Sequence, residues 1–140
     1  MRKLFGTDGI RGTIGNDLTA SLALNVGYAS AKVLGKDKNI KVLIARDTRI
    51  SGQMLVNAIS AGLMSAGANV IDIGIMPTPA VSYLVQKYKC DMGVMISASH
   101  NPYEYNGIKL FNNEGFKLAD ELEEEIEKVI FDNNKESNDK

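Results

Sequence analysis

The stretch Ser97-Ala98-Ser99-His100-Asn101-Pro102 places two serines beside the only histidine of the chain. A serine next to a histidine first suggests a nucleophile with its general base. However, the chain has no Gly-x-Ser-x-Gly elbow of the kind serine hydrolases use. Side chains of adjacent residues also tend to diverge, so His100 is poorly placed to deprotonate Ser99. A nucleophilic Ser99 needs another group to take its proton; the plainer alternative is that His100 is a solvated loop residue.

Other loops of the chain add cations and hydroxyl groups. Guanidinium groups pair with phosphate oxygens in a bidentate manner, and helix N-termini favour anions. In layered α/β domains, ligands gather at the carboxyl ends of the parallel strands, where these loops are expected. Taken singly, each arginine is more often a surface ion-pair partner. As a group, they predict a phosphorylated ligand. The residues are Arg11, Arg46, Asp47, Thr48, Arg49, Ser51 and Thr78.

The elements that must position these loops follow from the apolar periodicity. Apolar residues at i, i+3 and i+4 predict a helix through 22–34, capped by Asp17 or Thr19 and ended at Gly35. Ser51 is predicted to cap a second helix, which Gly67 ends. The glycine-rich residues 1–12 are predicted to form a loop. Further helices are expected around 81–85 and 119–130, and strands at 40–47, 69–74, 91–97 and 107–111.

Alternating strands and helices predict the fold class: a three-layer α/β/α domain with a mixed, mostly parallel sheet and one antiparallel edge hairpin. The turn-rich residues 112–115 are expected to join the hairpin, with strands at 107–111 and 116–118. Residues 1–131 are predicted to form this one domain. The polar residues 132–140 have no apolar periodicity and are expected to be a disordered tail or a truncated linker.

Composition restricts the class of protein. The 140 residues carry a formal net charge of −1 without a cluster of Lys and Arg, which argues against a nucleic-acid partner. No apolar run is long enough to span a membrane, and the N-terminus lacks the apolar region of a signal peptide. Cys90 is the only cysteine, so an intrachain disulfide is excluded and a reducing compartment is indicated. These features predict a cytoplasmic domain, in which Cys90 is structural.

Three segments together resemble the α-D-phosphohexomutases: "FGTDGIRG", "ARDTRISG" and "MISASHNPYEYNGIK". The resemblance runs from Arg2 to about Ile130. It is greatest to the members that interconvert glucosamine 6-phosphate and glucosamine 1-phosphate for cell-wall precursor synthesis. Tyr105 departs from this subgroup, where Asp is frequent, and is instead found in the mannose and glucose mutases. The resemblance therefore specifies the family more firmly than the sugar.

The resemblance implies a role for each residue of the predicted site. Ser99 is the phosphoserine, which gives its phosphoryl group to the sugar phosphate and receives the other one back from a bisphosphorylated sugar. Lys109 is the candidate general acid/base, and Arg11 stabilises charge on the transferring group, with His100 as a further contact. Gly107 is expected to let the chain turn and bring Lys109 over Ser99. The predicted phosphate and substrate contacts are Arg11, Ser97, His100, Asn101 and Arg46.

The resemblance also implies a Mg²⁺ ion bound through phospho-Ser99 and through aspartates of a second domain. This chain corresponds to the first of the family's four domains, so we expect it to be essentially inactive alone and to need the remaining domains as partners. Two alternatives stay open: the same domain of a phosphomannomutase/phosphoglucomutase, and a stand-alone binding module without catalysis. Apolar surface left uncovered is expected to favour self-association of the chain.

Overall fold

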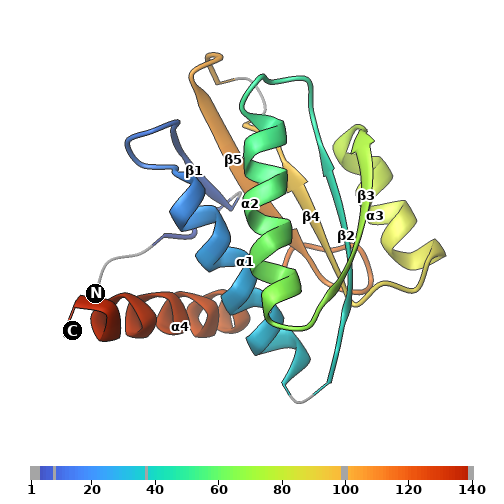
Figure 1. Ribbon diagram of the computed structural model, residues 1–140. Helices are drawn as coiled ribbons and strands as arrows, with labels where there is room; N and C mark the ends of the chain where they lie inside the picture. Colours follow the sequence, from blue (N-terminus) through green and yellow to red (C-terminus); the bar gives the residue numbers. More distant parts are fainter. Residues whose placement is uncertain (1–3, 8, 37, 99–100, 139–140) are drawn as a thin grey trace.

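The computed structural model describes residues 4–7, 9–36, 38–98 and 101–138 (Figure 1). Side chains are described as far as residue 132. The chain forms, in order, β1 (Ile10–Thr13), α1 (Ala20–Gly35), β2 (Lys41–Arg46), α2 (Gly52–Ser65), β3 (Asn69–Ile75), α3 (Thr78–Lys87), β4 (Met92–Ile96), β5 (Tyr105–Phe111) and α4 (Asp120–Asn138).

The described strands form one mixed sheet in the order β1-β5-β4-β2-β3. β2 pairs in parallel with β3 and with β4, whereas β5 pairs antiparallel with β4 and with β1. Helices α1, α2 and α4 pack against one face, and α3 packs against the other (Figure 1). The predicted α/β/α fold class with a mixed sheet is therefore confirmed.

Burial explains the arrangement of the central strands. β4 is buried along its whole length and β2 along all but its ends, which is the pattern of strands covered by helices on both faces. Helices α1 and α2 cross closely because glycine stands at both sides of the contact. A Cβ on Gly62 would lie 2.0 Å from Leu24 O, and one on Gly27 would lie 2.3 Å from Ile59 O. Neither position has room for a side chain.

The ends of the helices agree with the predicted signals in part. The Thr19 side chain accepts a hydrogen bond from Leu22 N, as expected of an N-cap. Ser51 is the N-cap residue of α2, but its hydroxyl makes no capping hydrogen bond. Gly67 follows α2 with a φ of 93°, the left-handed conformation that glycine adopts readily.

Three local predictions differ from the structure in whole or in part. The glycine-rich start contains β1, which exists because it pairs with β5. The expected hairpin is present only as a short return: Asn112 N donates to Phe116 O at 2.7 Å, Leu118 N donates to Leu110 O at 3.1 Å, and Phe111 forms a bridge with Lys117. Residues 116–118 add no strand to the sheet, whose antiparallel edge consists of β5 and β1. Helix α4 continues to Asn138, so residues 132–138 are helical where a disordered tail or a truncated linker was expected. An established helix adds one hydrogen bond per residue, so its extension does not need an apolar face.

Candidate active site

The segment that carries the predicted nucleophile lies between two fixed points of the main chain. Ser99 and His100 themselves lie outside the described residues. On one side, Ser97 is buried and its amide donates to Gly107 O at 3.0 Å. On the other side, Asn101 N donates to Ala98 O at 3.1 Å. The residues flanking Ser99 and His100 are thus held at the carboxyl end of β4.

The sheet register places three predicted site residues on one face. Arg11 lies opposite Gly107, and Lys109 lies opposite Met95. Opposite residues in a sheet point to the same face, as do residues two apart on one strand. The side chains of Arg11, Ser97 and Lys109 therefore share the α3 face, to which Met95 belongs. A cation from each of two strands faces the end of the strand that leads to Ser99.

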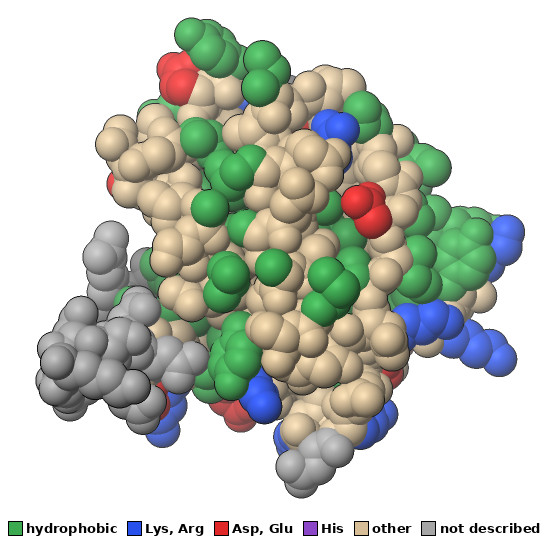
Figure 2. Space-filling view, in the orientation of Figure 1, with side chains coloured by type: hydrophobic (Ala, Val, Ile, Leu, Met, Phe, Trp, Pro, Cys, Tyr) green, Lys and Arg blue, Asp and Glu red, His purple; other side chains and the backbone are tan. Residues whose placement is uncertain are grey.

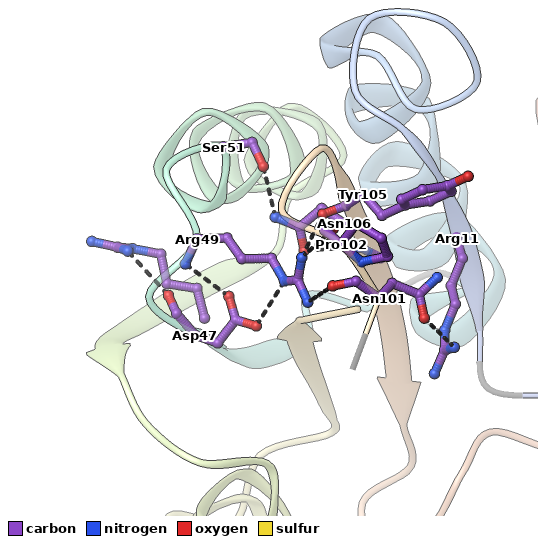
Figure 3. Close-up of polar contacts among 10 residues, drawn as sticks. Arg11, Asp47, Arg49, Ser51, Asn101, Pro102, Tyr105 and Asn106 are labelled. Carbon is purple, nitrogen blue, oxygen red and sulfur yellow. Dashed lines mark hydrogen bonds and ion pairs between the residues drawn. The ribbon is translucent and has the colours of Figure 1, made fainter. Parts of the chain in front are cut away.

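Arg11 also contacts the loop directly. Its Nη1 donates to Asn101 Oδ1 at 3.5 Å, which joins β1 to the residue just after His100 (Figure 3). The Arg11 side chain is exposed and so can meet a ligand. Gly107 lies within β5 and forms no turn, contrary to the prediction. Glycine at this position instead lets β5 approach Ser97 closely, since a Cβ there would lie 2.8 Å from Ser97 O.

Arg46 is not brought together with this group. It lies opposite Ile96 and so on the other face of the sheet, where its Cδ would be 3.0 Å from a Cβ on Gly52. Its Nη1 donates to Asp47 O at 3.2 Å. The assignment of Arg46 to phosphate binding stays a prediction.

Sequence reasoning missed Arg49, which counted only as one cation among several. Its guanidinium donates to Pro102 O at 2.8 Å, Tyr105 O at 3.0 Å and Asn101 O at 2.8 Å (Figure 3). Asp47 holds it in place, with Oδ1 accepting from Arg49 N at 3.1 Å and Oδ2 from Nε at 3.3 Å. In loops, an aspartate side chain commonly accepts a hydrogen bond from the amide two residues further along. The Asp47-x-Arg49 spacing was therefore the signal in the sequence that could have indicated this contact.

Asn106 was also missed. It is completely buried on β5, and its Nδ2 donates to Ser51 Oγ at 2.9 Å while its Oδ1 accepts from Gly107 N at 2.8 Å. Because the Ser51 hydroxyl meets Asn106, it is not the helix cap that the sequence predicted. The loop after His100 is therefore tied to the start of α2 as well as to Arg49 (Figure 3).

Lys109 lines a pocket together with Thr7, with Thr78 at the start of α3, with Lys117 and with Glu123 of α4. Lys117 Nζ donates to the buried Glu123 carboxylate at 3.0 Å. Burial raises the pKa of Glu123 above its ordinary value, although the bond to Lys117 opposes this change. Burial lowers the pKa of Lys117, but the bonds to Glu123 and Asp120 outweigh it and raise this pKa. The pocket thus brings cations from two segments, Lys109 and Lys117, beside the apolar side chains of Leu110 and Phe111.

The described residues do not form a magnesium site. Among residues 4–7, 9–36, 38–98 and 101–138, no group of three or more His, Cys, Asp or Glu side chains could hold a metal ion. Asp47, which follows β2, is paired with Arg49. Mg²⁺ requires several oxygen ligands in an octahedral arrangement. The part of this chain that the structure describes does not supply them.

The sequence of the chain matches a known family. The family model for phosphoglucomutase/phosphomannomutase, alpha/beta/alpha domain I, matches residues 2–137. The chain therefore belongs to the phosphoglucomutase/phosphomannomutase family and contains its domain I.

Curated relatives and a solved structure agree with this assignment. The chain is 57% identical over 131 residues to a phosphoglucosamine mutase of Clostridium botulinum, covering 93% of the chain and 29% of the relative. It is 58% identical over 135 residues to one of Alkaliphilus oremlandii, covering 95% and 30%. A phosphoglucomutase/phosphomannomutase family protein of Burkholderia thailandensis superposes with a TM-score of 0.78 at 33% identity, over 94% of this chain and 30% of that one. The chain thus spans about 30% of the length of the curated relatives.

One further finding concerns membranes. Within the residues that the structure describes, none of the helices has both the length and the apolar character needed to cross a bilayer.

Proposed function

We propose that this chain is the phosphoserine-bearing part of a phosphoglucosamine mutase. The observation that carries the proposal is the convergence of Arg11 and Lys109 on the α3 face at the end of β4, with Arg11 bonded to Asn101 beside Ser99-His100. The names of the 57–58% identical relatives support glucosamine phosphate as the substrate.

In the proposed reaction, phospho-Ser99 transfers its phosphoryl group to the O1 hydroxyl of glucosamine 6-phosphate. The new P–O bond forms as the bond between phosphorus and Ser99 Oγ breaks, and the proton of the attacking hydroxyl passes through the general acid/base, for which Lys109 is the candidate, to Ser99 Oγ. In the second transfer, Ser99 Oγ takes the 6-phosphate of the resulting 1,6-bisphosphate, its proton passes to the sugar O6, and glucosamine 1-phosphate leaves. The group is conserved over the cycle, so no other phosphate donor is consumed.

The residues of this chain contribute mainly position and charge. Phosphoryl transfer depends on alignment of the reacting oxygens and on stabilisation of charge on the equatorial oxygens. Arg11 is exposed and reaches the loop, which suits that second role. Ser97, His100 and Asn101 are assigned to phosphate or substrate contacts. The bound Mg²⁺ is assigned to phospho-Ser99 and to carboxylates outside this chain, and no step is derived through it.

The test follows the phosphoryl group by mass. This chain, supplied with the remaining family domains in one polypeptide or in trans, is incubated with glucosamine 1,6-bisphosphate. We expect a gain of one phosphate in the wild type and none in Ser99→Ala. Turnover of glucosamine 6-phosphate should be lost with the same substitution. Wild-type turnover by Ser99→Ala would overturn the phosphoserine assignment.

The sugar is tested separately. Assays with glucosamine 6-phosphate and mannose 6-phosphate compare kcat/KM for the two substrates. Preference for mannose 6-phosphate would assign the chain to a phosphomannomutase. If the complete assembly transfers no phosphoryl group to either sugar phosphate, the remaining interpretation is a binding module without catalysis.

A further inference from the structure

The main chain from Asn101 to Tyr105 has an unusual support. Three of its carbonyl oxygens, those of Asn101, Pro102 and Tyr105, accept hydrogen bonds from the single guanidinium of Arg49 at 2.8–3.0 Å. These carbonyls belong to residues 101–105, which lie outside any helix or form only the start of β5. Pro102 O also accepts from Tyr105 N at 3.0 Å, but irregular main chain lacks the regular ladder that would satisfy all of its carbonyls. Arg49 supplies a donor to all three carbonyls from another segment of the chain.

Arg49 is itself held in place by Asp47, which is bonded to β4. Asp47 binds both the amide and the Nε of Arg49, and its own amide donates to Ile96 O at 3.0 Å. Ile96 is the last residue of β4, three positions before Ser99. The contacts therefore form a closed path from β4 through Asp47 and Arg49 to the loop that follows His100. The Arg49 side chain is only 12% exposed, so water competes little for its donors.

The geometry requires arginine. A guanidinium presents five N–H donors in one plane, and those on Nη1, Nη2 and Nε point in different directions. Here each of these three nitrogens has an acceptor. A lysine ammonium is a single point from which carbonyls on different sides cannot all be reached. Lys at this position would keep the charge and lose most of the contacts.

We propose that Arg49 is a positioning residue for phosphoryl transfer, which acts through the main chain of residues 101–105 and does not touch the substrate. This inference rests on the proposed function, because it supposes that the segment ending at Asn101 carries the phosphoserine. Loss of the support shifts the reacting group, and a displacement of about 1 Å reduces turnover about a hundredfold. Binding of the sugar through other contacts changes less.

Two measurements test the proposal. Hydrogen exchange is measured on this chain for the wild type, Arg49→Met, Arg49→Lys and the control Lys87→Met, which removes an exposed cation on α3. We expect exchange of the Asn101 and Tyr105 amides to rise about tenfold or more in both Arg49 variants. Amides of α1 and β4 should keep wild-type protection in Arg49→Lys, which separates local loosening from unfolding.

Steady-state kinetics on the complete mutase provide the second readout. We expect kcat to fall about a hundredfold in Arg49→Lys while KM changes less than about threefold. Lys87→Met should match the wild type in both. Unchanged exchange of the two loop amides overturns the proposal, and so does faster exchange with unchanged kcat. Full activity of Ser99→Ala instead overturns the proposed function, and the exchange data then still report whether Arg49 holds the loop.

Discussion

Charged side chains hold irregular main chain in two regions of this domain, with opposite signs. Next to the candidate site, the Arg49 guanidinium donates to three carbonyls. Beside α4, the buried Glu127 carboxylate accepts from the amides of Leu4 and Phe5 at 3.1 and 2.8 Å. A cation is used where carbonyls converge, and an anion is used where amides converge.

The two regions differ in what they join. Arg49 links the loop after β2 to the loop after His100 and the start of β5, at one end of the sheet. Glu127 links the N-terminal segment to the last helix, so it closes the fold between distant parts of the chain (Figure 1). We therefore expect substitutions at Arg49 to affect local order and turnover, and substitutions at Glu127 to affect global stability.

The largest stability effect is expected at Glu127. Glu127→Ala leaves two amides without their acceptor, and bonds to a charged group contribute about 1.5–3 kcal/mol each. The free energy of unfolding, measured with urea, should fall by about 3 kcal/mol. Glu127→Gln keeps one acceptor oxygen and should lose less.

The matched control is Glu124→Ala, an exposed position one turn earlier on the same helix. Its effect should stay within about 0.5 kcal/mol. Equal effects of Glu124→Ala and Glu127→Ala would contradict the comparison.

A smaller effect on stability is expected at Asp47, which holds the Arg49 side chain in place. Asp47→Asn retains one acceptor for Arg49 N but loses the charge and the second acceptor, a change of about 1 kcal/mol. The measurable result is faster hydrogen exchange at the Tyr105 amide, with little change in the midpoint of urea unfolding. The control is Thr48→Ala, at the exposed residue between Asp47 and Arg49. A large drop in global stability would show that the two regions are not separate.

The pH dependence of the free energy of unfolding tests the contribution of Glu123, a buried carboxylate of α4. Its pKa in the folded state is raised by burial, against the effect of Lys117. From the ordinary pKa of Glu, about 4.3, up to this raised value, the folded state binds more protons than the unfolded state. This group's contribution to stability therefore decreases as the pH rises.

We expect Glu123→Gln to gain stability relative to the wild type as the pH rises from about 4 toward neutrality. Urea unfolding of both proteins over this range checks the sign. A relative loss of stability by Glu123→Gln over the same range would mean that the ion pair with Lys117 outweighs the cost of burial.

The smallest effect is expected at Cys90, a buried titratable group that holds no irregular segment by its side chain. It packs in the core under α3, and burial raises the pKa of its thiol. Labelling by a thiol reagent should be on the order of a hundredfold slower in the folded chain than in urea. Rapid labelling of the folded chain would indicate that this side of the core opens locally.

Surface apolarity is distributed unevenly, which bears on the predicted self-association. Hydrophobic side chains are scattered over the α1–α2 face and gather near β3 and α3 (Figure 2). Exposed residues in that second area are Ile75, Met76 and Tyr83. Self-association of the chain stays a prediction, which sedimentation at increasing concentration would test.

The helices, the parallel strands and the loops that carry the candidate site could be predicted because their signals are local. Thr19 and Gly67 marked helix ends, and the apolar run at 40–45 marked a buried strand. β1 could not be predicted, because a glycine-rich segment becomes a strand only when β5 is beside it. The contradicted role of Gly107 has the same origin, since the space it leaves is occupied by residues 97 and 10.

The sequence by itself determined the type and order of most elements, the family and the segment predicted to carry the chemistry. These depend on side-chain periodicity and on motifs read within a few residues. The tertiary structure decided which polar side chains meet: Arg11 with Asn101 on one face, Arg46 on the other, and Arg49 with carbonyls more than fifty residues away. The physical reason is that register and strand order are set by long-range pairing, and a shift of one residue moves a side chain to the opposite face.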